Sequence, residues 1–251
     1  MEAWHLLILF AAGIGIGFIN TIAGGGSLIA IPLLMLLGIP IQVANGTNRI
    51  AILFQNITSF VTFRAKGIKT PFRLAFLLAV MTTLGAIFGA FFAARVNPAV
   101  LKWAVIALLV VMLFLTLYKP QRWLKKKPLT LVKIRAWDYP LFFAIGFYGG
   151  FIQAGAGLLV TTALVLRVGF DAITAEAVKS FILPFYTIFA VIVFVLHGQV
   201  SYLLGFALAL GSMLGAWIAA KVAVKEGPKL VRYLLILVML FAAVYLIFFD
   251  R

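Results

Sequence analysis

The sequence predicts an all-α integral membrane protein that is built from two related halves. Of its 251 residues, 65% are hydrophobic and 11% are charged, and the mean hydropathy is +1.18. Soluble globular chains have an apolar share near one half, so this composition excludes that class. The apolar residues form blocks of about 20, the length with which a helix crosses roughly 30 Å of hydrocarbon. They show no strand-like alternation, which excludes a transmembrane β-barrel.

The apolar segments fall into two groups of five, separated by a basic stretch. Their ranges are 4–20, 27–39, 44–64, 72–94 and 98–117, then 139–153, 157–169, 175–197, 201–222 and 228–249. The second segment of each group has about 13 residues, which as a helix span roughly 20 Å and are short for a full crossing. Each of these short segments follows a glycine-rich break. We therefore expect the first two segments of each group to form a broken or re-entrant hairpin.

The two groups are similar in sequence, which indicates an internal repeat. A shift of the chain by 131 residues aligns positions 15–67 with 146–198 without a gap and matches Gly15 with Gly146, Gly24 with Gly155 and other glycines, alanines and phenylalanines. Further along, LGAIFGAFFAARV at 84–96 aligns with LGSMLGAWIAAKV at 210–222. The sequence thus predicts a first membrane repeat at 1–117, a basic linker at 118–138 and a second membrane repeat at 139–251.

The positive charges predict that the two repeats are inverted with respect to each other. If the first two segments of each half make a hairpin, most of the 21 Lys and Arg residues lie on one side of the membrane. The other side then keeps only four, Arg49, Arg95, Lys102 and Arg251. A parallel repeat would distribute the charges almost evenly. Because basic residues concentrate in the cytoplasm, we expect inverted repeats, a cytoplasmic linker and both termini outside.

Several classes of activity find no support in the residue content. The chain has no cysteine and two histidines, which argues against thiolate chemistry and against a thiolate or imidazole metal site. It has no phosphate-binding loop, no hydrolase motif and no acid pair in the apolar segments, so we expect neither an enzyme nor a bound cofactor. The net charge of +15 fits topology and lipid contact better than nucleic-acid binding, because no folded domain accompanies the basic linker.

The two glycine-rich breaks are the first candidate site for a ligand. In inverted repeats one hairpin enters from each side, so the two tips should approach each other near the midplane. Each tip opens a short helix, at about Ser27 and Leu158, whose N–H groups suit an anion. The candidate residues are Asn20, Thr21, Gly24, Gly25, Gly26 and Ser27 in the first tip and Gln153, Gly155, Ala156 and Gly157 in the second. Close helix packing is the alternative role for the glycines.

The third segment of each half carries polar residues and is the second candidate. Asn45, Asn48, Gln55, Ser59 and Thr62 recur at three- and four-residue steps and form one stripe, and the equivalent stripe holds Glu176, Lys179 and Tyr186. Such stripes face a substrate pathway or bond to another helix.

Lys179 has three alternative roles in this reading. It balances the charge of a substrate, pairs with Glu176 one turn away, or extends to the lipid headgroups. Arg49 is open to the same alternatives. Glu176 and Lys179 are also the candidates for proton coupling, while His197 is expected at a solvated helix end.

Two further features have structural interpretations. The Gly85–Gly89 spacing and its copy Gly211–Gly215 are typical of close helix packing. Asp171 is expected in a surface turn after Gly169.

The segment GFINTIAGGGSLIAIPLLMLLGIP with ANGTNR downstream, repeated weakly as GFYGGFIQAGAGLLVTTALVLRVGF with AEAVKS, resembles the TauE/SafE family of sulfite exporters over essentially the whole chain. The residues that match the family's pattern are Asn20, Gly24 to Ser27, Asn45, Thr47, Asn48 and Arg49. The second half lacks the triple glycine and the Asn-Gly-Thr-Asn run.

The resemblance implies a secondary transporter of the cytoplasmic membrane that moves sulfite, organosulfonates or related anions, usually outward. Together with the repeats, it predicts alternating access, with the anion held between the tips by backbone N–H groups, Asn20, Ser27 and Gln153. The implied partners are the anion, membrane lipid and a coupling ion such as the proton. An anion channel on the same scaffold and a non-catalytic subunit of a membrane complex are the alternatives.

Overall fold

The described part of the chain is helical, in a computed structural model that describes residues 3–93, 134–231, 233–234 and 236–237. The helices of the first half are α1 (Ala3–Ala23), α2 (Ser27–Leu36), α3 (Ile41–Ala65) and α4 (Phe72–Ala93). Those of the second half are α7 (Asp138–Phe151), α8 (Ala156–Ala163), the π-helical turn η2 (Leu164–Val168), α9 (Ala172–Leu196) and α10 (Tyr202–Glu226).

Four of these helices are long and apolar enough to cross a membrane. They are Trp4–Ala23, Phe72–Phe92, Ala172–Leu196 and Tyr202–Glu226. The all-α membrane class is therefore confirmed. The predicted segment 98–117, most of the basic linker and most of the segment 228–249 lie outside the described residues.

The helix that follows the first break and the helix that follows the second are both short, as predicted. With 10 residues, α2 is roughly 15 Å long, about half of a hydrocarbon core. The second short helix begins at Ala156, two residues before the expected start at Leu158, and its last turn widens into η2. Gly169, with φ of 96°, ends this segment in the left-handed conformation.

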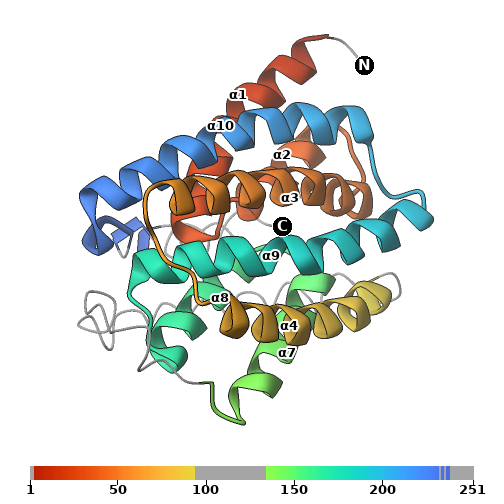
Figure 1. Ribbon diagram of the computed structural model, residues 1–251. Helices are drawn as coiled ribbons and strands as arrows, with labels where there is room; N and C mark the ends of the chain where they lie inside the picture. The colour runs from red at the N-terminus through yellow and green to blue at the C-terminus, as the bar shows by residue number, and fades with distance from the viewer. Residues whose placement is uncertain (1–2, 94–133, 232, 235, 238–251) are drawn as a thin grey trace.

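Helices from different halves pack against each other. The first helix of each half lies on the fourth helix of the other half, α1 on α10 and α7 on α4. The two central helices α3 and α9 also pack together. In addition, α3 packs against α10 of the second half, and α9 packs against α4 of the first half. Figure 1 shows that α3 and α9 run in opposite directions, so the loops that follow them lie at opposite edges of the bundle.

The contacts of α1 with α10 and of α7 with α4 are made through glycine backbone. A methyl group added to Gly211 would lie 2.0 Å from the carbonyl oxygen of Phe10, and one added to Gly85 would lie 2.0 Å from that of Phe143. The same crowding occurs at the facing glycines, which are Gly13, Gly17, Gly89, Gly146, Gly150 and Gly215. The predicted role of the Gly85–Gly89 and Gly211–Gly215 pairs in close packing is confirmed.

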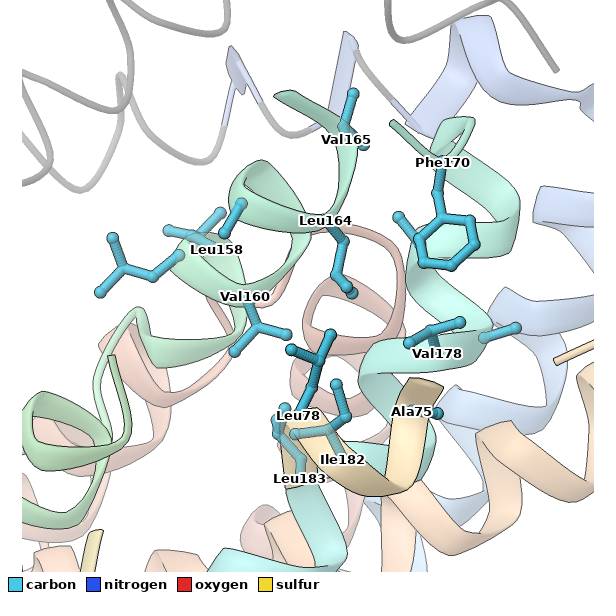
Figure 2. Close-up of a cluster of buried hydrophobic side chains, with 14 of the residues drawn as sticks. Ala75, Leu78, Leu158, Val160, Leu164, Val165, Phe170, Val178, Ile182 and Leu183 are labelled. Carbon is cyan, nitrogen blue, oxygen red and sulfur yellow. The ribbon is translucent and has the colours of Figure 1, made fainter. Parts of the chain in front are cut away.

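The larger apolar core lies beside the second short helix. Figure 2 shows Val160 of α8 and Leu164 of η2 pointing toward Leu78 of α4 and Ile182 of α9, all members of this core. All residues of α8 are thus buried, whereas α2 leaves Met35 and Leu36 exposed at its end. Large apolar side chains on the outer faces of the long helices stay exposed, among them Leu7, Phe88 and Trp217, as expected of surfaces in contact with lipid.

Asp171 differs from its predicted place in a surface turn. Its side chain is buried and caps α9 by accepting hydrogen bonds from the backbone N–H of Ile173 and Thr174, both at 3.1 Å. A carboxylate is the favoured partner for N–H groups at a helix start, and that explains its burial there.

Two glycines of α1, two residues apart, provide a matched test of the packing. A methyl group on Gly17 would lie 2.2 Å from the carbonyl oxygen of Ser212, whereas one on Gly15 meets nothing within 4 Å. We expect Gly17→Ala to destabilise the protein by about 1–3 kcal/mol, because α1 and α10 must separate. Gly15→Ala should be neutral or slightly stabilising, because alanine favours a helix. Thermal unfolding in one detergent compares them, and equal midpoints would contradict the packing.

Candidate functional site

The first helix break is held by Asn20, near the end of α1. The side-chain Oδ1 of Asn20 accepts a hydrogen bond from the backbone N–H of Gly26 at 3.1 Å, and its own carbonyl accepts from Gly24 N–H at 2.8 Å. Gly24 has φ of +72°, which an L side chain adopts with strain. The break is therefore a compact turn closed from within, and its side chains are almost completely buried.

The second break uses a different local structure. Gln153 and Gly155 are both left-handed, with φ of 65° and 75°. Gln153 is the one described residue other than glycine with positive φ, a conformation that is uncommon outside glycine, asparagine and aspartate. The carbonyl of Gln153 accepts from Ala156 N–H at 3.1 Å and so leads into α8. Tertiary contacts of the Gln153 side chain hold this backbone in place.

The two breaks contact each other, as the sequence predicts. A methyl group on Gly24 would lie 2.4 Å from the carbonyl carbon of Gly157 and 2.5 Å from the nitrogen of Leu158. The backbones at the ends of α1 and the start of α8 are therefore in direct contact. Residues near 24 and near 157 form one buried centre.

The polar stripe of α3 faces this centre. Asn48 Nδ2 donates to Ser27 Oγ at 3.0 Å, and the hydroxyls of Ser59 and Thr21 are hydrogen-bonded at 2.8 Å. Gln55 lies on the same helix face between Asn48 and Ser59. Its side chain is 1% exposed, and neither its Nε2 nor its Oε1 has a hydrogen-bond partner in the described part of the chain.

Arg49, which follows Asn48, contacts the second break. Its side chain is fully buried, and Nη1 donates to Gln153 Oε1 at 2.8 Å and to the carbonyl oxygen of Gly149 at 3.2 Å. Nη2 donates to the carbonyl oxygen of Gly150 at 2.7 Å, and the guanidinium lies 4.7 Å from the ring centre of Phe194. All these acceptors are neutral.

Lys179 of α9 contacts the first break. Its ammonium donates to the carbonyl oxygens of Asn20 at 3.0 Å and Thr21 at 3.1 Å, in the last turn of α1. It also forms an ion pair with Glu176, whose other carboxylate oxygen accepts from Thr161 Oγ1 at 2.9 Å. Both charged side chains are completely buried, so Lys179 does not extend to the headgroups.

The remaining predicted residues complete the network. The hydroxyl of Tyr186 accepts from Gln153 Nε2 at 3.1 Å, and Asn45 Nδ2 donates to the carbonyl oxygen of Phe151 at 3.3 Å. Gly25 lies in the first turn, where its carbonyl accepts from Leu28 N–H. The structure thus gathers the predicted residues around the two breaks. Their part in binding a ligand is a proposal, argued below.

Thr161 was not named in the sequence analysis, and Arg49 was named there with the same open alternatives as Lys179. The sequence contained a signal for Arg49, because it is a cation in a predicted membrane segment. The repeat also aligns its neighbour Asn48 with Lys179. A threonine in an apolar helix carries no such signal. The described residues contain no group of three or more His, Asp or Glu side chains that could hold a metal ion.

The ion pair of Lys179 and Glu176 can be tested by stability. We expect Lys179→Met to lower the free energy of unfolding by about 3–5 kcal/mol, because it leaves a buried carboxylate unpaired. Adding Glu176→Gln should restore part of this loss. Lys225→Met, an exposed site at the end of α10, is the control. Thermal unfolding in detergent measures all four proteins, and equal midpoints for Lys179→Met and Lys225→Met would disprove the structural role of the pair.

Similar proteins are known from several bacteria. A protein named "Probable membrane transporter protein ORF9" from Sinorhizobium sp is 30% identical over 246 residues, 98% of this chain and 94% of its own length. A probable membrane transporter protein of Haemophilus influenzae is 29% identical over 237 residues, 92% of this chain and 90% of its own. The probable membrane transporter protein YfcA of Escherichia coli K12 is 28% identical over 237 residues, 92% of this chain and 85% of its own.

No solved structure is significantly similar to the chain. The profile of one protein family, described as "Sulfite exporter TauE/SafE", matches residues 9–246. This match covers nearly all of the sequence, and the chain therefore belongs to the TauE/SafE sulfite exporter family.

Proposed function

We propose that the protein is a secondary transporter of the cytoplasmic membrane that exports sulfite, an organosulfonate or a related small sulfur-containing anion. Its family and the transporter names of its relatives support transport as the activity. The observation that carries the proposal is the contact between the two helix breaks, at Gly24 and Gly157. Irregular backbone at membrane depth is tolerated where protein or a ligand pathway satisfies its polar groups.

Free hydrogen-bonding capacity beside the first break supports a polar ligand. Gln55 has two unpartnered side-chain atoms, and Asn48 has an unpartnered Oδ1, all buried. A buried polar atom without a partner costs roughly 1–3 kcal/mol. An oxygen of the ligand would recover this cost at Gln55 Nε2, the one donor among these three atoms. Asn20, Ser27 and Gln153 are engaged in bonds within the centre and would exchange them for the ligand.

Inverted repeats and alternating access form the mechanism that we propose. Glycines related by the 131-residue shift share positive φ angles, Gly24 with Gly155, Gly38 with Gly169, and Gly67 with Gly198. The repeat relates α1 to α7 and α10 to α4, so the packed pair α1–α10 corresponds to the packed pair α7–α4. The equivalent helices α3 and α9 are antiparallel (Figure 1). Both observations support two halves that rock against each other about the junction of the breaks. Glu176 and Lys179 are the candidates for coupling to protons.

The proposed topology is testable because the chain has no native cysteine. Lys66 and His197 are equivalent under the repeat, and both are exposed residues that directly follow a central helix. In oriented cells we expect Lys66→Cys to react only with a membrane-permeant maleimide, because it faces the cytoplasm. His197→Cys should react with an impermeant maleimide from outside. Labelling of both from one side would contradict the inverted arrangement.

The proposed activity is tested by sulfite flux into proteoliposomes, with and without an imposed pH gradient. We expect saturable sulfite movement with counterflow, and no movement of sulfate or of a cationic amino acid. Counterflow distinguishes a carrier from an anion channel, which does not drive uptake of one anion against its gradient by the exit of another. If reconstituted protein moves neither sulfite nor sulfonates, the anion-transport proposal fails. A stoichiometric partner in mild detergent would then favour the subunit alternative.

A further inference from the structure

We propose that Arg49 is the residue that binds the negative charge of the transported anion, because no carboxylate among the described residues pairs with its guanidinium. This inference rests on the proposed transport of an anion. It is carried by the comparison of two buried cations, Arg49 and Lys179, which hold equivalent places in the two halves.

Arg49 and Lys179 make parallel contacts. The repeat aligns Lys179 with Asn48, the neighbour of Arg49. Lys179 extends from α9 to two carbonyl oxygens in the last turn of α1. Arg49 extends from α3 to two carbonyl oxygens in the last turn of α7. Each break is thus held by a cation from the central helix of the other half, where the negative end of the helix dipole favours it.

The two contacts differ in net charge. Lys179 is neutralised by Glu176 in an ion pair. The position equivalent to Glu176 in the first half is Asn45, which is neutral and donates to the carbonyl oxygen of Phe151. The Lys179 contact is therefore neutral, whereas the Arg49 contact carries one positive charge that no described residue compensates.

The other described carboxylates are committed elsewhere. Asp138 pairs with Arg167 at 3.1 Å, and Asp171 caps α9. Glu226 is exposed at the end of α10. Among the described residues no carboxylate therefore contacts the guanidinium of Arg49.

A fully buried charge with neutral partners alone is unfavourable, and an anion of the right size removes this cost. Arg49 also has a free donor, because its Nε has no partner in the described part of the chain. A guanidinium binds the oxygens of sulfite or a sulfonate through several N–H groups at once. The bonds to Gln153 and the helix carbonyls hold the guanidinium at the junction of the breaks before the anion arrives.

Substitution of Asn45 tests this directly, because a glutamate there copies Glu176 and lies one turn before Arg49. We expect Asn45→Glu to bind sulfite at least about tenfold more weakly than Asn45→Gln, since the new carboxylate competes with the anion. The ligand-free Asn45→Glu protein should also unfold at a higher temperature than Asn45→Gln. The two side chains have the same length, so the comparison isolates the charge.

A second comparison removes the cation. Arg49→Gln should weaken sulfite binding by about tenfold or more, while Arg64→Gln, at an exposed position of the same helix, should retain it. Sulfite affinity is measured by calorimetry on purified protein. The affinity of Arg49→Gln is interpreted only if size-exclusion chromatography shows a folded, monodisperse protein. If it does not fold, the Asn45 pair decides.

The outcomes separate the two proposals. Absence of sulfite and sulfonate binding by the native protein would refute the proposed function and this inference with it. Native binding with equal affinities for Asn45→Glu and Asn45→Gln would refute the role of Arg49 alone. Native binding with the predicted difference supports both.

Discussion

The contact of two glycine backbones, Gly24 in the first break and Gly157 in the second, is the constraint on which the centre of this protein depends. No side chain fits between them, since an added methyl group would lie 2.4 Å from a backbone carbon. Their contact brings the carbonyl ends of α1 and the start of α8 into one buried region. The long side chains of α3 and α9 then reach the breaks and satisfy the backbone groups that a broken helix leaves open.

The hydrogen bonds of the polar centre join opposite halves of the chain. Lys179 bonds to carbonyl oxygens about 160 positions earlier in the sequence, and Arg49 to oxygens about 100 positions later. Bonds of this kind tie the halves together at the level of single side chains, while the glycine interfaces do so along whole helices. The two sides differ in charge, with a neutral ion pair of Lys179 and Glu176 at the first break and the guanidinium of Arg49 among neutral partners at the second.

Much of the fold could be predicted from sequence, because its signals are local. Apolar length marked the helices, glycine runs marked the breaks, and the spacing of Gly85 and Gly89 marked a close helix contact. Polar residues at three- and four-residue steps also identified the face of α3 that lies against the first break. In each case the physical cause acts within a few turns of the chain, so a periodic pattern reports it.

The parts that escaped prediction depend on contacts between distant residues. The left-handed backbone of Gln153 has no sequence signature, because it is held by the side chains of Arg49 and Tyr186 from other helices. The pairing of Lys179 with Glu176 was one of three alternatives, and the carbonyl oxygens of α1 that hold its ammonium belong to residues far away in the sequence. Asp171 was expected in a surface turn because the third apolar segment of the second half was expected to begin at residue 175. Since α9 begins at Ala172, Asp171 is its N-cap instead.

The packing of α1 on α10 has a consequence for biosynthesis. The glycine face of α1 finds its partner only when the last described long helix has been made, since α1 ends at Ala23 and α10 begins at Tyr202. At about 5–20 residues per second, translation of the intervening chain takes on the order of 10–40 seconds. During that interval the glycine face of α1 cannot be covered by α10. The ribosome therefore completes most of the chain before the first helix can be locked in place.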